Sequence, residues 1–364
     1  MRAAWEGLDA AKVWDCHAHL LGSGDSGSGI FVNPRMDSLF NPAQYARRLF
    51  FLNAGCVHDA RGSVDQAYVE RMHNLLDGMR PGVKLLLFAF ERAHDERGVP
   101  DMERTAFHVP DAYARDTAKR HAAYFEWAAS IHPYRRDAVE ALQKAKGEGA
   151  RAMKWLPAAM GIDPASPRCD GFYQAMRKLE MPLISHAGEE RAVLGHETHD
   201  YGNPLRLRRA LDAGVRVVIA HCASLGQDRD LDRGPNGPYV ESFSLFTRLF
   251  ENPAYEKQLF GDISAMTQLN RAGPALERVI ENESWHARLL NGSDYPLPGV
   301  MPIFSVDYLV SLGLLSEHAA PLLKEIRSHN PLLFDFVCKR LLRANGKALS
   351  ARVFETRRFF DSAV

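Results

Sequence analysis

The sequence predicts an α/β protein in which residues 1–364 form a single (β/α)8 TIM barrel domain. Short apolar runs alternate with segments of helical periodicity, a pattern typical of parallel strands joined by helices. Eight such units can be counted, and eight units favour a closed barrel over an open sheet. An open doubly wound sheet is the alternative fold, but the chain has no Gly-x-Gly-x-x-Gly turn to support it.

The predicted strands and helices follow one another in a regular order. The first strand starts at Val13 and ends in His19, and the others are residues 83–90, 124–131, 151–156, 182–186, 215–221, 259–263 and 287–292. The main predicted helices are residues 42–52, 65–79, 111–120, 136–146, 171–179, 204–213, 242–250, 274–282 and 331–342. Gly147 and Gly214 follow two of these helices, and glycine is common there because it adopts the left-handed conformation that ends a helix.

The chain is longer than a bare barrel, which needs about 250 residues. We expect the surplus in an extended connection between the first and second strands (residues 20–82), in a charged loop (91–103) and in extra C-terminal helices. The connection begins with a Gly/Ser-rich segment, residues 22–29, which either closes over the mouth of the barrel or is a passive flexible loop.

Composition excludes several classes of function. Lys plus Arg and Asp plus Glu number 45 each, so no net charge favours nucleic acid or an anionic membrane as partner. No apolar run approaches the roughly 20 residues that span a bilayer. The first residues lack the apolar core of a signal peptide. Five scattered cysteines without a Cys-x-x-Cys pair suit a reducing compartment, so we expect a cytoplasmic protein.

A His-x-His pair ends the first predicted strand. Side chains two residues apart on a strand point to the same face, so His17 and His19 can bring two imidazoles to one point. Imidazole is a common ligand of divalent metals. The pair is weak evidence alone, because in a chain with 15 histidines about 0.6 such pairs are expected by chance.

Other chemically active side chains fall at the ends of later strands. Active sites of such barrels form at the C-terminal ends of the strands. Those ends carry Lys154, His186 and His221, and Asp294 follows the last strand. With the histidine pair they make a set in which five of six residues are standard metal ligands, which is far less expected by chance than one pair.

The order His-x-His, Lys, His, His, Asp resembles that of the amidohydrolase superfamily of metal-dependent hydrolases. The segments RAMKWLP around Lys154, SHAGEE around His186, VIAHC around His221 and NGSDYP around Asp294 are most similar to its amidohydrolase-related branch. That branch contains hydrolases, lactonases and non-oxidative decarboxylases such as aminocarboxymuconate-semialdehyde decarboxylase. The resemblance extends over residues 13–298 and the helix that follows Asn330.

The resemblance implies a ligand set. His17, His19, His186 and Asp294 would surround one divalent ion, with zinc favoured, and Asp294 would also take a proton from the activated water. His221 would bind a second ion or, in members with one metal, act as an acid–base group or polarise the substrate. A zinc ion that lowers the pKa of water to about 7 and a carboxylate beside it suit hydrolysis at neutral pH.

Lys154 is open to two interpretations. In two-metal members of the superfamily a lysine on the fourth strand is carboxylated and bridges the ions, because an ammonium has no lone pair to give. In single-metal relatives the lysine is free and holds a substrate carboxylate. We favour one ion, which makes Lys154 a substrate-binding or structural residue. A lysine that faces water beyond the barrel rim is the third possibility.

Weaker candidates follow other strands. Glu91 and Arg92 come after the second strand, where the arginine would pair with a substrate carboxylate, unless both are an ordinary solvated pair. Glu189 or Glu190, next to His186, would orient a ligand or the substrate. His132 and Asp262 are candidates for groups that support a metal ligand, or for polar residues of the rim. Cys16 lies between the two histidines and is expected to pack rather than to react.

The leading functional hypothesis is a metal-dependent hydrolase that uses metal-activated water to cleave a C–N or C–O bond of a small molecule, such as an amide, cyclic amide or lactone. The alternative is a metal-dependent non-oxidative decarboxylase of an aromatic or unsaturated carboxylic acid. A barrel that has lost its metal and only binds a partner is a third possibility, which the intact ligand set disfavours. The resemblance also allows a homodimer, since barrels of this branch are often dimers.

Overall fold

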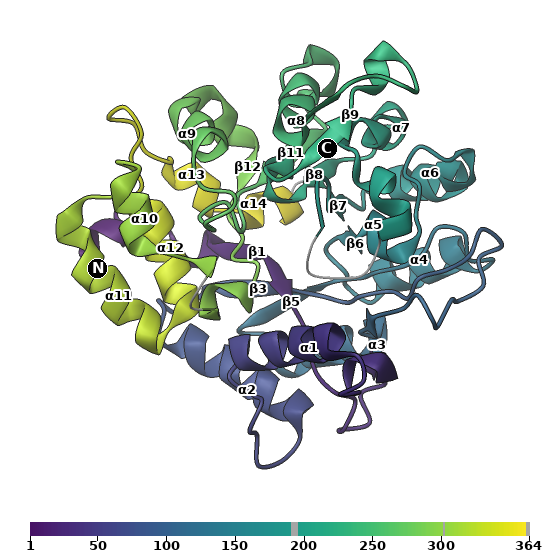
Figure 1. Ribbon diagram of the computed structural model, residues 1–364, viewed down its shortest axis with the longest axis horizontal. Coiled ribbons are helices and arrows are strands. Elements are labelled where there is room, and N and C mark those ends of the chain that lie inside the picture. The colour runs from purple at the N-terminus through teal and green to yellow at the C-terminus, as the bar shows by residue number, and fades with distance from the viewer. Residues whose placement is uncertain (191–195, 301–302, 362–364) are drawn as a thin grey trace.

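Eight parallel strands carry the fold in the computed structural model, which describes residues 1–190, 196–300 and 303–361 (Figure 1). They are β1 (Trp14–His19), β3 (Lys84–Phe88), β5 (Phe125–Ala128), β6 (Met153–Trp155), β7 (Leu183–Ser185), β8 (Val217–Ile219), β11 (Leu259–Asp262) and β12 (Leu289–Leu290). They form a three-stranded sheet of order β1-β3-β5 and a five-stranded sheet of order β12-β11-β8-β7-β6. The protein is therefore α/β with parallel sheets, as predicted.

The two sheets approach each other at both edges. A single parallel bridge joins Ala129, after β5, to Met153 of β6. Another joins Ala18 of β1 to Tyr295, which follows β12. Strand edges in the two sheets therefore find partners in the other sheet, which satisfies backbone groups that an open edge would leave exposed.

A core cluster of apolar side chains lies between the strands. Its buried members are Cys16, Leu86, Phe88, Ala128, Ala152, Ile184, Val218, Leu290 and Phe359, and Phe260 and Phe360 pack against them. Each of the eight strands, or the residue beside it, contributes, and the two phenylalanines of the last helix complete the cluster. Cys16 is completely buried there, in agreement with its predicted packing role.

Helices surround the strands in Figure 1. They are α1 (Pro42–Ala54), α2 (Val64–Asp77), α3 (Asp111–Arg120), α4 (Ala138–Gly147), α5 (Pro157–Met160), α6 (Asp170–Lys178), α7 (Arg208–Asp212), α8 (Ser242–Phe250), α9 (Pro274–Glu281), α10 (Val306–Ser311), α11 (Ala320–His329), α12 (Pro331–Leu341), α13 (Ala351–Phe354) and α14 (Arg357–Asp361). The helices predicted at 111–120 and 242–250 coincide with α3 and α8. None of the described helices is long and apolar enough to cross a membrane.

Between β1 and β3 the chain forms the short strand β2 (Phe31–Val32), helix α1 and helix α2. β2 pairs antiparallel with β4 (Phe107–His108), which lies in the connection after β3. A second small sheet joins β9 (Gln227–Arg229) to β10 (Tyr239–Glu241). Figure 1 shows α1 and α2 beside the β1-β3-β5 sheet.

The Gly/Ser-rich segment is anchored by one buried carboxylate. Asp65, at the start of α2, accepts backbone hydrogen bonds from Ser23 (2.7 Å) and Gly24 (3.0 Å). Its other oxygen accepts from the hydroxyls of Ser26 (2.7 Å) and Ser28 (2.6 Å). This anchor could not be predicted from a local pattern, because the loop and the aspartate are about forty positions apart. The loop therefore has specific internal partners rather than the free ends of a linker.

The strands are shorter than predicted, and the difference has a physical reason. The apolar runs predicted at 182–186 and 215–221 end as strands at Ser185 and Ile219. The chain leaves the sheet at His186 and, through the turn η7 (Ala220–Ala223), at His221. His186 and His221 thus lie just beyond their strands, whereas His17, His19 and Lys154 lie within β1 and β6.

Candidate metal centre and active site

One cavity collects the histidines, the lysine and the aspartate that the sequence singled out. Its lining includes His17, His19, Lys154, His186, His221 and Asp294. Each lies at or just after the C-terminal end of a parallel strand, where barrels of this type form their active sites. Apart from His19, all of them are buried.

Backbone contacts between β1 and the segment after β12 fix the first three positions. The Asp294 N–H donates to His17 O (2.8 Å), and the His19 N–H donates to Tyr295 O (2.9 Å). Gly292 allows this approach, since a Cβ there would lie 2.5 Å from His17 Cβ. The pairing of β1 with β3 is also irregular between Asp15 and Ala18, which includes His17. Such irregularities re-aim side chains and are common beside active sites.

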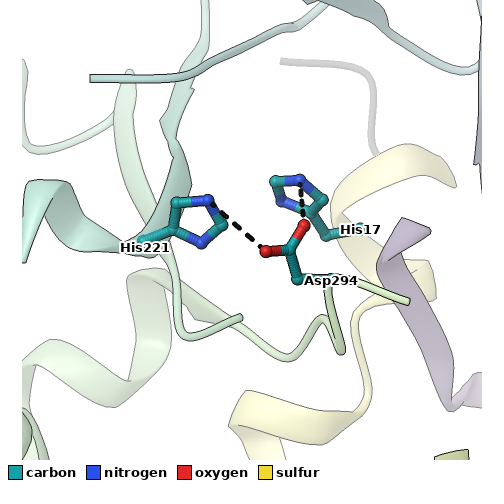
Figure 2. A group of neighbouring side chains, drawn as sticks. All are labelled: His17, His221 and Asp294. Carbon is teal, nitrogen blue, oxygen red and sulfur yellow. Dashed lines mark ion pairs between the residues drawn. The ribbon is translucent and has the colours of Figure 1, made fainter. Parts of the chain in front are cut away.

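His17, His221 and Asp294 form the centre of the site (Figure 2). One ligand atom from each lies within 4.8 Å of the others. His17 Nε2 is 3.4 Å from Asp294 Oδ1, and His221 Nε2 is 4.0 Å from Asp294 Oδ2. The carboxylate therefore lies between two imidazoles that come from opposite parts of the sequence.

Hydrogen bonds at the far side of each ring assign its tautomer. His17 Nδ1 lies 2.8 Å from Asp262 Oδ2, and a carboxylate accepts, so Nδ1 carries the proton. His221 Nδ1 lies 2.9 Å from the carbonyl oxygen of Ser264, which likewise accepts. Each ring thus presents an Nε2 lone pair toward Asp294. This is the arrangement in which a hydrogen-bond partner orients a metal-binding imidazole.

Asp262 is the hub behind the two rings. Besides His17 Nδ1, it accepts the His221 N–H (2.9 Å), the Ser264 N–H (3.0 Å) and the Ser264 hydroxyl. Burial raises the pKa of the Asp262 carboxyl, but His17, His221 and Ser264 together lower it by more than burial raises it. The pKa of Asp262 therefore lies below its ordinary value. A single ionised carboxylate thereby holds the imidazole of His17 and the backbone of His221.

Burial sets the protonation state of the site. It lowers the pKa of His17 to about 4, assisted by Lys154, and that of His221 to about 3, assisted by Arg271. Burial alone raises the pKa of Asp294, but His221, His19 and His17 lower it more, to a value well below its ordinary range. Near neutral pH the site therefore offers neutral imidazoles and an ionised carboxylate, which are the forms that bind a cation.

The backbone around His221 and Asp294 is strained. His221, Cys222 and Ala223 all have positive φ angles (55°, 50° and 49°), and Asp294 has a φ of 62°. Non-glycine residues rarely adopt this left-handed conformation, which costs of order 1–3 kcal/mol each and is concentrated at functional sites. The hydrogen bond from the His221 N–H to Asp262 helps to hold the turn.

The remaining two histidines flank this centre. His19 Nε2 lies 3.1 Å from Asp294 Oδ1, the oxygen that His17 also approaches. The ring centroids of His186 and His221 are 5.4 Å apart, and His186 Nε2 lies 3.2 Å from Glu190 Oε2. Burial, followed by His221, holds the pKa of His186 well below its ordinary value.

Lys154 extends into the same centre. Its Nζ lies 3.3 Å from His17 Nε2 and 4.7 Å from the ring centroid of Phe88. The residue is only 1% exposed, which rules out a lysine directed to water beyond the rim. Burial lowers the pKa of its ammonium, against the opposing effect of Asp262 and Asp294.

The donor set fits a divalent cation. In a tetrahedral zinc site with bonds of about 2.0–2.1 Å, neighbouring ligand atoms lie roughly 3.3 Å apart. His17 Nε2 and Asp294 Oδ1 (3.4 Å) and His19 Nε2 and Asp294 Oδ1 (3.1 Å) have this spacing. For the His17 contact, a lone pair faces a carboxylate oxygen with no proton between them, and a cation would satisfy both.

The structure separates three predicted substrate residues from this cavity. Glu91 and Arg92 line a second hollow, and the Glu91 carboxylate lies 2.6 Å from Arg135 Nη1. Among the described residues it is Glu190, rather than Glu189, that lines the metal cavity. The predicted substrate roles of Glu91, Arg92 and Glu189 have no test in this geometry and stay predictions.

Several residues of the site could not be predicted from the sequence. Arg47 and Arg271 line the cavity, and Ser264 binds His221 from behind. Asp262 was a weak candidate whose central place became clear only in the structure. Arg47 lies on α1 and Arg271 on the loop after β11. The position of Asp262 at the end of a strand made it a candidate. Arginines on helices and loops, in contrast, have the sequence pattern of ordinary surface residues.

The sequence matches a known protein family. A family model described as amidohydrolase matches residues 14–332, which is most of the chain. The chain belongs to the amidohydrolase family. The chain is therefore an enzyme. Members of this family are generally metal-dependent, and the cluster of His17, His221 and Asp294 is a possible metal site. No curated protein matches the sequence in a separate comparison.

Solved structures share the fold at low sequence identity. IDCase of Metarhizium anisopliae is 11% identical with a TM-score of 0.51, over 98% of this chain and 97% of that one. A probable 2-pyrone-4,6-dicarboxylic acid hydrolase of Acinetobacter baumannii is 14% identical with a TM-score of 0.46, over 90% and 95%. A 2,6-dihydroxybenzoate decarboxylase from Rhizobium is 14% identical with a TM-score of 0.45, over 89% and 98%. These similarities do not decide between hydrolysis and decarboxylation.

Proposed function

We propose that this amidohydrolase-family enzyme is a metal-dependent hydrolase that cleaves a C–N or C–O bond of a small molecule, such as an amide, cyclic amide or lactone. The observation that carries the proposal is the position of Asp294, an ionised carboxylate 3.1 Å from His19 Nε2 and 3.4 Å from His17 Nε2 in a cavity with apolar walls. Such a group both binds a cation and accepts a proton.

We further propose one ion, with zinc favoured, held by His17, His19, His186 and Asp294. When bound, the ion supplies an activated water and polarises the bond under attack. Asp294 accepts the proton of that water and passes it to the leaving group. His221 Nε2 faces the second oxygen of Asp294 at 4.0 Å and shares this acid–base role. Lys154 stays uncarboxylated and faces the substrate.

The proposal includes a closed barrel. The bridges at Ala18–Tyr295 and Ala129–Met153, together with the interior cluster to which every strand contributes, support a single (β/α)8 barrel. Five free cysteines support a reducing cytoplasm as its location.

A decarboxylase is the second candidate, favoured by one observation. Lys154, Arg47, Arg48 and Arg271 line a cavity whose walls are otherwise largely apolar, which suits an aromatic or unsaturated carboxylic acid. Metal and His221 would serve that reaction as well. The two candidates differ in their products rather than in their site.

A single experiment tests the reaction and the metal. Purified protein is analysed for metal content and incubated in H₂¹⁸O with lactones, cyclic amides and aromatic carboxylic acids. We expect one ion per chain and a product carboxylate that carries ¹⁸O; release of CO₂ without a new carboxylate would establish the decarboxylase instead. His186→Ala should lose the ion, whereas His221→Ala should keep it and lose turnover. Loss of the ion in both variants would make His221 a ligand.

A further inference from the structure

Two arginine N–H groups in the cavity are buried without a hydrogen-bond partner. They are Nη1 of Arg47 and Nε of Arg271, and neither has a partner among the residues that the structure describes. Both side chains line the cavity that contains the metal centre. Buried polar groups are nearly always paired, and an unpaired donor on a charged group costs more than a neutral one. Such donors in a binding cavity indicate a ligand that accepts from them.

Arg271 belongs to the metal end of the cavity. Its positive charge is among the causes that lower the pKa of His186 and of His221. Burial lowers the pKa of Arg271, and the negative charges of Asp294 and Glu190 oppose this effect. Its Nη1 donates to Ser224 Oγ at 3.3 Å, which fixes one edge of the guanidinium. Nε, on another edge, has no such partner.

Arg47 reaches the cavity from the connection between β1 and β3. It lies on α1, which also contributes Phe51 and Leu52 to the cavity wall. Its neighbour Arg48 lines the cavity too, but Arg48 Nε is engaged by Asp37 at 2.9 Å. Of the two adjacent arginines, Arg47 therefore keeps a buried donor for a ligand. Figure 1 shows α1 beside the sheet that carries β1.

The rest of the wall restricts what this ligand is. Phe51, Phe90 and Phe107 contribute aromatic rings, and aliphatic side chains such as Leu21, Leu52 and Leu156 line the cavity as well. A ligand that satisfies both features has an apolar body and a group with oxygen acceptors and negative charge. Guanidinium donors match the planar carboxylate in a bidentate geometry.

We propose that the cavity binds a carboxylic acid with an apolar, ring-sized body, and that Arg271 and Arg47 bind its carboxylate oxygens. The inference rests on the proposed function in that it places the substrate of the metal centre in this cavity. It makes the two arginines residues that determine specificity, and it leaves the bond to be cleaved open. A substrate with an amide or lactone must then carry a separate carboxylate.

Binding of matched small ligands tests the inference without turnover. We would measure the dissociation constants of benzoate, benzamide and phenyl phosphate, with metal-loaded protein and again after removal of metal with a chelator. These ligands share the phenyl ring and differ in the group that faces the arginines. We expect benzoate to bind at least tenfold more tightly than benzamide in both states. Phenyl phosphate should bind no more tightly than benzoate.

Three variants assign the preference to the arginines. Arg271→Gln and Arg47→Gln should each weaken benzoate binding at least fivefold and change benzamide binding less than twofold. Arg278→Gln is the control, because Arg278 pairs with Glu251 at 3.0 Å on the surface, and it should change neither. Melting temperatures check folding. If Arg47→Gln does not fold, Arg47→Lys keeps the charge, removes the guanidinium and should still weaken benzoate binding.

Equal binding of benzoate and benzamide would overturn the inference, as would unchanged benzoate binding in both arginine variants. A benzoate preference that disappears when the metal is removed would assign the carboxylate to the ion and overturn it too. Tighter binding of phenyl phosphate would replace the ligand class. Failure of the hydrolase proposal leaves these measurements interpretable, because none of them depends on turnover.

Discussion

Two pairs of buried histidines in this protein differ in what their ring nitrogens face. His17 and His221, with ring centroids 4.9 Å apart, form part of the metal centre, and His94 and His132, 4.4 Å apart, lie beside the second hollow. All four have a pKa lowered by burial. Burial and a lowered pKa therefore do not distinguish a functional histidine from a structural one.

The distinction lies in the lone pairs. His132 Nε2 donates to Met160 O (3.1 Å) and Nδ1 accepts the Tyr134 N–H (3.2 Å), so the backbone uses both nitrogens. In His17 and His221 the partners of Nδ1 are the Asp262 carboxylate and the Ser264 carbonyl oxygen, and Nε2 faces the Asp294 carboxylate. Lys154 Nζ also lies 3.3 Å from Nε2 of His17. A lone pair that faces a carboxylate across a cavity marks the metal centre, and the predictions below test this criterion.

The largest effect is expected at the carboxylate itself. Asp294→Asn replaces an ionised ligand and proton acceptor by a neutral amide that is a poor ligand and no base. We expect a loss of at least a thousandfold in kcat/KM, about 4 kcal/mol of transition-state stabilisation, with loss of bound metal. Elemental analysis and steady-state kinetics, on a substrate found in the H₂¹⁸O experiment, are the measurements.

The matched control is His132→Gln in the other pair. It should keep the metal and remain within about threefold of the wild-type kcat/KM, because His132 has no free lone pair to offer. If His132→Gln loses metal, or if Asp294→Asn retains both metal and turnover, then the lone-pair criterion does not separate the two pairs.

A smaller effect is expected at Asp262, which contacts His17 and His221 on the side away from the metal centre. Asp262→Asn keeps an oxygen for the His17 Nδ1–H but removes the charge that fixes both imidazoles. Loss of such a supporting carboxylate typically weakens metal affinity by about 10–100-fold. Competition with a chelator measures this affinity. Asp228→Asn is the control, since Asp228 is a buried carboxylate that accepts from Ser242 Oγ at 2.7 Å away from the site. Equal affinities in the two variants would show that Asp262 does not position the ligands.

Much of the fold and of the site could be predicted from the sequence, because hydrophobic periodicity and the positions of strand ends are local properties of the chain. The eight apolar runs became the eight parallel strands, and His17, His19, Lys154, His186, His221 and Asp294 all line one cavity. A parallel sheet places every strand end on the same side, so alternation along the chain is sufficient to bring these residues together. Their individual roles stay predictions until metal and products are measured.

The rest of the site could not be predicted, because it depends on contacts between residues far apart in the sequence. Asp262 is central because residues 245 positions apart meet in the His17 contact. Arg47 looks like an ordinary surface residue of an amphipathic helix until α1 is placed against the cavity. Glu91 and Arg92 also follow a strand as predicted, but they line another hollow, where Glu91 pairs with Arg135. Side-chain direction after a strand end is set by loop geometry, which alternation does not fix.

The smallest effect concerns the stability of the protein, and it tests the other histidine pair, His94 and His132. Burial, followed by the charge of His94, lowers the pKa of His132 from 6.5 to about 2, and the hydrogen bond to Met160 opposes this effect. Between these two pKa values the unfolded chain binds a proton at His132 and the folded chain does not. The stability that neutral His132 provides is therefore present above pH 6.5 and is lost progressively as the pH falls below it.

The expected size follows from linkage. At pH 5.5, one unit below the unfolded pKa, this one site costs about 1.4 kcal/mol of unfolding free energy relative to pH 7.5. His132→Gln cannot bind the proton, so the stability difference between wild type and variant should shrink by that amount between pH 7.5 and 5.5. Denaturant unfolding of both proteins at the two pH values measures it. Protonation of the metal ligands acts on both proteins and cancels in the difference. A difference that does not change with pH would mean that His132 titrates normally in the folded protein, and that burial does not hold it neutral.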